Sequence, residues 1–272
     1  MSKSLLTQPY YNQSEILENN QNKTPISDFE AIIFDFDGTL AKSFPLFLTI
    51  FTEELNERSF IVKQDSIERL TKEIFVEEIS NGNERLEPKV LLLKVFYKTC
   101  RKLGLTRRSG ILRTLYSAYK IRKNYQNIEL FTGAPFLLEE LYNQGIPLIL
   151  ITHSKRDNIL KILRREGLDQ YFNIILDRKN IGADKTAGIV KALEAYGIDP
   201  KNAIAIGDLP ADIVEAKAAG VKTVAITGGL VNKQIMETKN PDYTIENVYQ
   251  LKYILNSIKL NTFLEKKEKI HA

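Results

Sequence analysis

The sequence predicts an α/β fold: a Rossmann-like parallel sheet with helices on both faces, interrupted by an inserted all-α domain. Three observations lead to this prediction. From residue 132 onward, short apolar runs alternate with amphipathic helical segments. An earlier apolar run at 31–34 is separated from these by a long helical stretch. The length of 272 residues suits about two domains, so we expect one discontinuous domain and one insert.

The first expected strand is the apolar run at 31–34, which reads Ala-Ile-Ile-Phe and is followed by an aspartate. From about residue 43 to residue 127 the pattern is helical almost throughout. Turn residues predict breaks in this stretch at 81–83, at Gly104 and at 109–110. The insert is therefore expected to contain several helices and no strand.

The second half of the chain is expected to alternate strands and helices. Strands are predicted at 147–151, 171–176, 203–206 and 221–226. Helices are predicted at 135–144, 155–166, 186–196, 211–219 and 246–258. Glycines that follow the first four of these helices indicate where they end. Ser154 is expected to be the N-cap of the second helix, with Asp157 at the capping-box position.

These elements predict a division of the chain into four parts. Residues 28–42 and 130–260 would form the discontinuous α/β core, residues 43–129 a helical insert, residues 1–27 a polar leader and residues 261–272 a Lys-rich tail.

The composition is that of a globular protein, with 43% apolar and 26% charged residues. A single cysteine, Cys100, excludes an internal disulfide and favours a reducing compartment, and we expect it to be a small buried apolar residue. No apolar stretch approaches the ~20 residues of a membrane span, and the first residues lack a secretory signal. A cytoplasmic location is therefore expected.

Charge is unevenly distributed although the net charge is only +4. Residues 51–93 contain ten acidic and six basic residues, whereas residues 94–123 contain ten basic residues and no acidic one. One interpretation is a solvated helix face balanced by the acidic half. The other is a positive surface that faces an anionic substrate, a membrane or a nucleic acid. The aromatic residues there have the spacing of helical packing, so nucleic-acid binding is not expected.

Polar residues follow the predicted strands, at the strand ends or in the turns after them, and one of them opens the helix after the third strand. They are Asp35, Asp37, Thr152, Lys185, Asp208 and Asp212. Because ligands of open parallel sheets bind at the carboxyl ends of the strands, we expect these side chains to converge. Three carboxylates at one edge repel each other unless a cation is present, and hard oxygen ligands favour Mg²⁺. The pattern predicts a magnesium site.

This set of residue types suits phosphoryl transfer. A carboxylate can attack phosphorus and form an aspartyl phosphate, while Mg²⁺ offsets the repulsion between the two anions. A second acid two residues further on can protonate the leaving oxygen and later activate water. A hydroxyl and an ammonium group can bind the remaining phosphoryl oxygens.

In these motifs the sequence resembles the haloacid dehalogenase superfamily, in its phosphatase branch, and within it the phosphoglycolate-phosphatase-like members. The motifs are Asp35-Phe36-Asp37-Gly38-Thr39, Thr152 after an apolar strand, Lys185 near a helix start, and Gly207-Asp208 followed by Asp212. The resemblance covers residues 30–40 and 130–230. In that family a helical insert directly after the first motif is called a C1 cap.

The resemblance implies a role for each acid. Asp35 would be the nucleophile and a metal ligand. Asp37 would be the general acid and base and would offer its backbone carbonyl to the metal. Asp208 would bind Mg²⁺, and Asp212 would support the metal shell or orient the motif lysine.

The phosphoryl group would be held by Thr152 and Lys185. Many family members have a Lys-Pro pair, which is missing here, and Lys179 competes for the same role. Lys185 precedes Asp208 by 23 residues and opens a predicted helix, whereas Lys179 lies in a basic turn. We therefore assign the motif lysine to Lys185.

The expected function is that of a Mg²⁺-dependent phosphatase acting on a small phosphate monoester through an aspartyl phosphate. Phosphonate hydrolase and phosphomutase chemistry remain open within the superfamily, and so does a non-catalytic interaction protein that uses the basic insert face. Asp37 disfavours a dehalogenase, and Asp35 on the first strand disfavours a response-regulator receiver domain. The natural substrate and the oligomeric state are left open.

Overall fold

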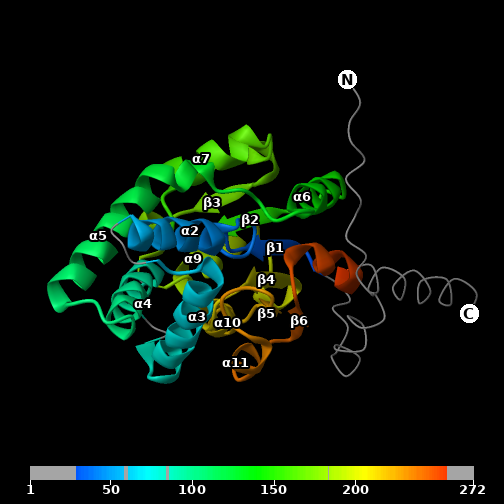
Figure 1. Ribbon diagram of the computed structural model, residues 1–272. Coiled ribbons are helices and arrows are strands. Elements are labelled where there is room, and N and C mark those ends of the chain that lie inside the picture. Colours follow the sequence, from blue (N-terminus) through cyan, green and yellow to red (C-terminus); the bar gives the residue numbers. More distant parts are fainter. Residues whose placement is uncertain (1–28, 58–60, 84–85, 183, 256–272) are drawn as a thin grey trace, which may run out of the picture.

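The computed structural model describes most of the chain between residues 29 and 255 (Figure 1). The described ranges are 29–57, 61–83, 86–182 and 184–255. The leader predicted for 1–27 and the tail predicted for 261–272 lie outside these residues. No helix within these ranges has the length and apolar character needed to cross a membrane.

Six parallel strands form one sheet in the order β3-β2-β1-β4-β5-β6. The strands are β1 (Ala31–Phe34), β2 (Leu148–Ile151), β3 (Ile174–Leu176), β4 (Ala203–Gly207), β5 (Lys222–Ile226) and β6 (Tyr243–Ile245). β1 pairs with β2 on one side and with β4 on the other, so Phe34 lies opposite both Leu150 and Ile206. The strand order reverses at β1, and the residues that follow β1 and β4 therefore meet at one crevice.

Helices cover both faces of the sheet. They are α6 (Ala134–Asn143), α7 (Arg156–Arg165), α8 (Arg178–Ile181), α9 (Thr186–Glu194), α10 (Pro210–Ala218) and α11 (Lys233–Glu237). Ile32 and Phe34 pack with α6 and α7, whereas Ala31 and Ile33 pack with α9 and α10. Successive side chains of a strand point to opposite faces, so a strand covered on both sides is apolar at every position. This confirms the predicted fold class.

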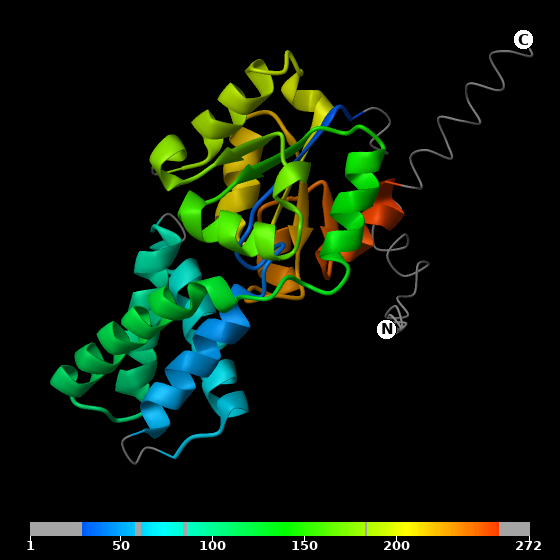
Figure 2. The ribbon, with the colours of Figure 1, turned by 90° about the horizontal axis from the view of Figure 1, so that it is seen from above.

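Among the described residues between β1 and α6, four α-helices and a short turn are inserted. They are α2 (Ser43–Asn56), α3 (Gln64–Ser80), α4 (Pro88–Lys102), α5 (Arg107–Asn124) and the 3₁₀ turn η2 (Tyr125–Asn127). Figure 2 shows them gathered beside the sheet. They share a core in which the rings of Phe51 and Phe96 stack at 4.1 Å and Cys100 is fully buried.

The inserted helices also touch the sheet domain. Ile74 and Phe75 of α3 belong to the same buried cluster as Ile213 of α10. Glu87, just before α4, forms an ion pair with Arg178 of α8. The insert is therefore seated on the α10 side and also reaches α8.

The break predicted at 109–110 is wrong, because both residues lie inside α5. The helix starts earlier: Thr106 is the N-cap, and its hydroxyl accepts a hydrogen bond from the Ser109 backbone N–H at 3.2 Å. Gly110 is a packing residue, since a Cβ atom there would lie 3.3 Å from Cβ of Cys100. The glycine permits close approach of α5 to α4 and does not end the helix.

The N-cap predicted at Ser154 is also wrong. Lys155 occupies the N-cap position of α7 and makes no side-chain cap, and Asp157 is an acidic residue in the first turn. The Ser154 hydroxyl instead donates a hydrogen bond to Asp37. A tertiary contact with a charged group takes precedence here over a local cap.

Two further boundaries differ from the prediction. Residues 169–171 form a 3₁₀ turn, so the strand predicted at 171–176 shortens to β3. The C-terminal helix predicted from residue 246 begins only after the edge strand β6, with a 3₁₀ turn at Val248–Gln250 and helix at 251–255. Residues 256–258 of that prediction lie outside the described ranges. A three-residue strand is too short for hydrophobic periodicity to reveal it.

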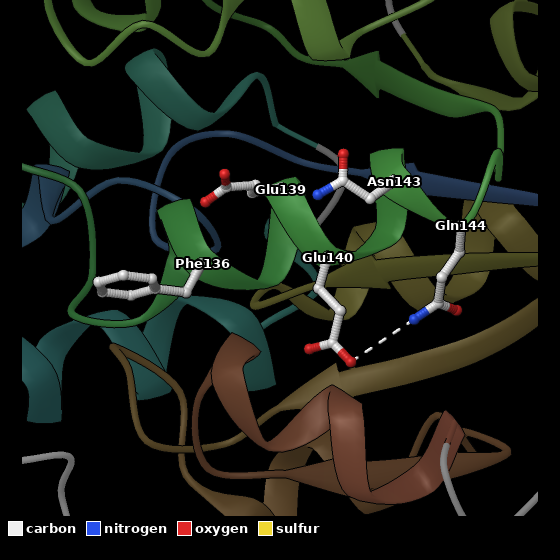
Figure 3. A pocket seen from close by; sticks show the side chains of 5 residues that line it. All are labelled: Phe136, Glu139, Glu140, Asn143 and Gln144. Carbon is white, nitrogen blue, oxygen red and sulfur yellow. Dashed lines mark hydrogen bonds between the residues drawn. The ribbon is translucent and has the colours of Figure 1, made fainter.

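A shallow hollow lies along α6 (Figure 3). Its lining residues are Phe136, Glu139, Glu140, Asn143 and Gln144. They all belong to the helix or to its C-cap residue, and Gln144 donates a hydrogen bond to Glu140 at 3.5 Å. Among the residues that the structure describes, no second element contributes to it, and none of the predicted site residues lines it.

Candidate active site

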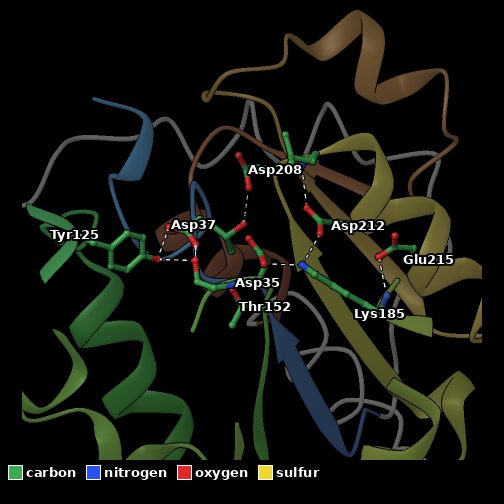
Figure 4. A network of polar contacts seen from close by, with 11 residues as sticks. Asp35, Asp37, Tyr125, Thr152, Lys185, Asp208, Asp212 and Glu215 are labelled. Atoms are coloured by element: carbon green, nitrogen blue, oxygen red, sulfur yellow. Dashed lines mark hydrogen bonds and ion pairs between the residues drawn. The ribbon is translucent and has the colours of Figure 1, made fainter. Parts of the chain in front are cut away.

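Three carboxylates meet at the carboxyl edge of the sheet (Figure 4). Asp35 directly follows β1, Asp208 directly follows β4, and Asp212 lies in the first turn of α10. One oxygen from each of the three lies within 4.8 Å of the others. The pairing of β1 with β4 brings together residues that are far apart in the sequence.

Lys185 lies among these carboxylates. Its Nζ donates hydrogen bonds to Oδ1 of Asp35 at 2.5 Å and to Oδ1 of Asp212 at 2.7 Å. The other oxygen of Asp212 accepts from the Leu209 backbone N–H at 3.0 Å, so Asp212 closes the first turn of α10 while it holds the lysine. Lys179 is exposed on α8, and within the described ranges it has no contact with these acids. The structure thus brings Lys185, and not Lys179, to the predicted carboxylates.

The pKa values of two of the carboxylates, Asp35 and Asp208, are raised because they have little contact with water and other negative charges lie close by. Burial raises the pKa of Asp35 to about 7, Lys185 opposes the rise, and Asp212 and Asp37 add to it. Burial also raises the pKa of Asp208 well above its usual range, with further contributions from Asp35 and Asp212. Burial opposes protonation of Lys185, but the charges of Asp212 and Asp35 raise its pKa above the ordinary value.

One buried ammonium does not balance three carboxylates, of which Asp208 is buried and Asp35 and Asp212 are nearly so. A divalent cation would lower the pKa of Asp35 and of Asp208, since an opposite charge favours the ionised form. The donors are hard carboxylate oxygens, which Mg²⁺ prefers. The residues present therefore fit a divalent cation.

Two glycines allow the acids to approach so closely. Gly38 has φ +86°, and a Cβ atom on it would lie 2.1 Å from Oδ2 of Asp208. A Cβ atom on Gly207 would lie 2.3 Å from Cβ of Asp212. The Thr39 hydroxyl donates to Oδ1 of Asp208 at 3.2 Å and so fixes the carboxylate against this turn.

Asp37 faces a different set of partners. Tyr125 Oη donates to its Oδ1 at 2.6 Å, and the hydroxyls of Ser43 and Ser154 also donate to this carboxylate. Ser43 is the first residue of α2 and Tyr125 directly follows α5, so both junctions of the insert contact Asp37. Burial raises the pKa of Tyr125 well above its ordinary value, and the charge of Asp37 adds to this, so the phenol remains a donor.

The remaining predicted residue, Thr152, is buried where β2 ends, beside the end of β1. Its Oγ1 accepts a hydrogen bond from the Ser154 backbone N–H at 3.1 Å. Sequence reasoning missed Glu215 of α10, whose carboxylate accepts from the Lys185 backbone N–H at 3.0 Å. Helix α10 therefore holds Lys185 at two points, by its ammonium through Asp212 and by its backbone through Glu215.

The sequence is similar to a known protein family and to named relatives. A family model described as haloacid dehalogenase-like hydrolase matches residues 32–226. A putative pyrophosphatase PpaX of Caldanaerobacter subterraneus is 27% identical over 228 residues, which are 83% of this chain and 94% of that protein. Phosphoglycolate phosphatase 1 of Pseudomonas aeruginosa is 26% identical over 222 residues, 81% of this chain and 77% of that protein.

Solved structures share the architecture. A hydrolase of Deinococcus radiodurans, solved with bound phosphate and sodium, has a TM-score of 0.68 at 17% identity and covers 86% of this chain and 98% of its own. A protein described as a predicted phosphoglycolate phosphatase, from Haemophilus somnus, has a TM-score of 0.63 at 21% identity over 84% of this chain and 98% of its own. At these identities the likeness concerns the fold.

Proposed function

The chain belongs to the haloacid dehalogenase-like hydrolase family, and from this premise we propose that it is a Mg²⁺-dependent phosphatase for a small phosphate monoester. The observation that carries the proposal is the cluster of three largely buried carboxylates around the Lys185 ammonium. Pyrophosphate is a second candidate substrate, because a relative that matches 83% of this chain is named a pyrophosphatase.

Asp35 and Asp208 would hold the metal, together with the Asp37 backbone carbonyl that the family pattern implies, and Asp212 would support them. When bound, Mg²⁺ would offset the repulsion between Asp35 and the phosphate and polarise the phosphoryl group. Lys185 and the Thr152 hydroxyl would bind the other phosphoryl oxygens, as charge-assisted and neutral donors respectively.

The chemistry would proceed in two steps. A carboxylate oxygen of Asp35 attacks phosphorus, the bond from phosphorus to the ester oxygen breaks, and Asp37 donates a proton to the departing alkoxide. Asp37, now ionised, then takes a proton from a water molecule whose oxygen attacks the phosphorus of the aspartyl phosphate. The bond between phosphorus and the Asp35 oxygen breaks, phosphate leaves, Asp35 is again a carboxylate and Asp37 is again protonated.

We also propose that residues 43–129 act as a cap on a core formed by residues 28–42 and 130–260. The contacts of Ser43 and Tyr125 with Asp37 support this, because movement of the insert at its two junctions would move the partners of the general acid. Closure over the substrate would exclude water from the phosphoryl group.

The direct test is phosphate release from a panel of sugar phosphates, nucleotides, phosphoglycolate, pyrophosphate and an aryl phosphate, with Mg²⁺ and with EDTA. We expect release that depends on Mg²⁺ and is greatest for one class of monoester. Release from pyrophosphate alone would favour the second candidate. Failure of every compound, with a folded metal-binding protein, would contradict the phosphatase proposal.

Metal binding is expected to stabilise the fold in a pH-dependent way. Because the pKa of Asp35 rises from 3.8 to about 7 on folding, the folded state holds this proton more tightly, and the metal-free protein loses stability as pH rises through this window. Mg²⁺ competes with the proton, so its stabilising effect should grow as pH approaches and passes 7. At a hundredfold excess over Kd it should reach about 2.7 kcal/mol.

Thermal unfolding at several pH values, with Mg²⁺ and with EDTA, measures this effect. Stabilisation by Mg²⁺ of equal size at pH 5 and at pH 8 would contradict the assignment of Asp35 as a ligand. Calcium is the matched control cation, since it tests charge with a larger ion.

Tyr125→Phe is expected to lower kcat about tenfold to a hundredfold with little change in KM. The substitution removes one hydrogen bond to a carboxylate, which is worth roughly 1.5–3 kcal/mol, without emptying the buried space. Kinetics across the pH range, with Tyr142→Phe at an exposed tyrosine as the control, test the prediction. An unchanged kcat and pH profile would show that Tyr125 does not position Asp37.

A further inference from the structure

Helix α5 exposes most of its large apolar side chains to solvent and does not bury them against the neighbouring helices. Its buried residues are small or polar over most of their length: Gly110, Thr114, Ser117 and Ile121. Apart from Ile121, its large apolar side chains are exposed by 41% to 66% and are Ile111, Leu112, Leu115, Tyr116 and Tyr119. A surface helix normally shows the opposite pattern, and an exposed apolar patch of this kind marks an interaction site.

Cations stand at both ends of this apolar strip. Arg107 and Arg108 precede it, and Arg122 and Lys123 follow it, all four exposed. In the part of the chain that the structure describes, none of the four forms an ion pair with an acid. We call the apolar strip and these four cations the outer face of α5.

Other basic residues of α4 and α5 form ion pairs with glutamates. Five of the ten basic residues at 94–123 pair with glutamates on or next to α2 and α3; they are Lys94, Lys98, Lys102, Arg113 and Lys120. The acidic half of the insert thus neutralises the inner side of α4 and α5. The excess positive charge that remains is concentrated on the outer face of α5.

We propose that the outer face of α5 binds an anionic lipid surface. A helix with apolar side chains along one face and Lys and Arg around them can lie in the plane of the membrane interface. Ile111, Leu112 and Leu115 would enter the boundary between headgroups and acyl chains. The tyrosine rings would lie at headgroup level, and the four cations would contact lipid phosphates.

The shape of this surface favours a membrane over a protein groove. α5 packs mainly against α2 and α4 and lies at the edge of the molecule in both views (Figures 1 and 2). Its exposed side is therefore a convex surface and not a groove. A protein partner would need a carboxylate placed opposite each cation, whereas a layer of anionic headgroups offers phosphates everywhere along its plane.

A second copy of this chain is the less favourable occupant. If two α5 helices met antiparallel, Arg107 and Arg108 of one would face Arg122 and Lys123 of the other. If they met parallel, each basic end would face its own copy. Both arrangements bring like charges together and bury them without an acid among residues 94–123. The charge pattern opposes self-association in either orientation.

Vesicle co-sedimentation of the full chain tests the proposal. The probes are vesicles of phosphatidylcholine alone and vesicles that also contain phosphatidylserine, each at low and high salt. We expect binding to the anionic vesicles only, weakened by salt. Leu112→Ser combined with Leu115→Ser, and separately Arg108→Gln combined with Arg122→Gln, should each weaken binding about tenfold or more.

Matched variants at other exposed positions serve as controls. Phe136→Ser with Val214→Ser removes exposed apolar side chains elsewhere, and Lys191→Gln with Lys201→Gln removes exposed cations elsewhere. Both should bind like the wild type. Equal binding to both vesicle types, or undiminished binding of the two α5 variants, would overturn the proposal. So would a dimer in ultracentrifugation that the leucine variant abolishes, with no vesicle binding by the wild type.

Discussion

Asp35→Asn is expected to abolish turnover, by about 10⁴-fold or more, and to leave the protein folded. The amide has almost the same shape as the carboxylate, but it is a far poorer nucleophile and cannot form the aspartyl phosphate. The substitution also removes one negative charge from a site where Asp208 and Asp212 remain. Since burial raises the pKa of Asp35 and repulsion from Asp212 and Asp37 adds to the rise, the metal-free variant should be at least as stable as the wild type.

Steady-state kinetics and thermal unfolding, both with and without Mg²⁺, measure these two effects separately. The variant should gain less stability from Mg²⁺ than the wild type, because it has lost a ligand. Asp157→Asn on the exposed start of α7 is the matched control and should retain activity. Activity within tenfold of the wild type in Asp35→Asn would exclude Asp35 as the nucleophile.

The position of the candidate site was predictable because two of its acids, Asp35 and Asp208, directly follow strands. An apolar run that ends at Asp35, and another that ends before Asp208, place both residues where parallel strands finish. The strand pairing then fixes their neighbourhood, since Phe34 lies opposite Ile206. Lys185 was expected to converge with these acids, but its contact with Asp35 does not follow from a strand end, because Lys185 precedes α9 and its place depends on how α9 and α10 pack.

The partners of Asp37 had no sequence signal. Tyr125 lies 88 residues from Asp37, and in the sequence it is one of several tyrosines at helical spacing. A serine before a helix ordinarily indicates an N-cap. The sequence therefore predicted an N-cap at Ser154 and not its contact with Asp37. Such contacts arise where the insert joins the sheet domain, and a local pattern of apolar residues contains no information about that junction.

Glu215 makes another contact that the sequence alone does not predict. Its carboxylate lies three residues after Asp212 on α10, a spacing of two acids that the sequence also contains at 54/57 and 65/68. Only the packing of α10 against the start of α9 brings it to the Lys185 backbone N–H. Burial raises the pKa of Glu215 to about 7, which distinguishes it from an exposed glutamate.

Lys185→Ala is expected to lower kcat by about 10²–10³-fold, the loss that follows removal of one preorganised charged donor to a developing anion. It should also destabilise the metal-free protein, by about 3–5 kcal/mol, because it breaks a buried ion pair and leaves Asp35 and Asp212 without their cation. Mg²⁺ should restore part of this stability, since it supplies positive charge to the same carboxylates, but it should not restore kcat.

Lys179→Ala is the matched comparison, because it removes the same side chain from an exposed position six residues earlier. A surface substitution of this kind should change stability by no more than about 0.5 kcal/mol, and kcat should remain that of the wild type. Kinetics and unfolding of the two variants side by side measure the difference. If Lys179→Ala lost more activity than Lys185→Ala, the phosphoryl-binding lysine would be Lys179, and the contacts of Lys185 with Asp35 and Asp212 would serve stability alone. If both retained activity, phosphate binding would depend on the metal and the Thr152 hydroxyl without a lysine.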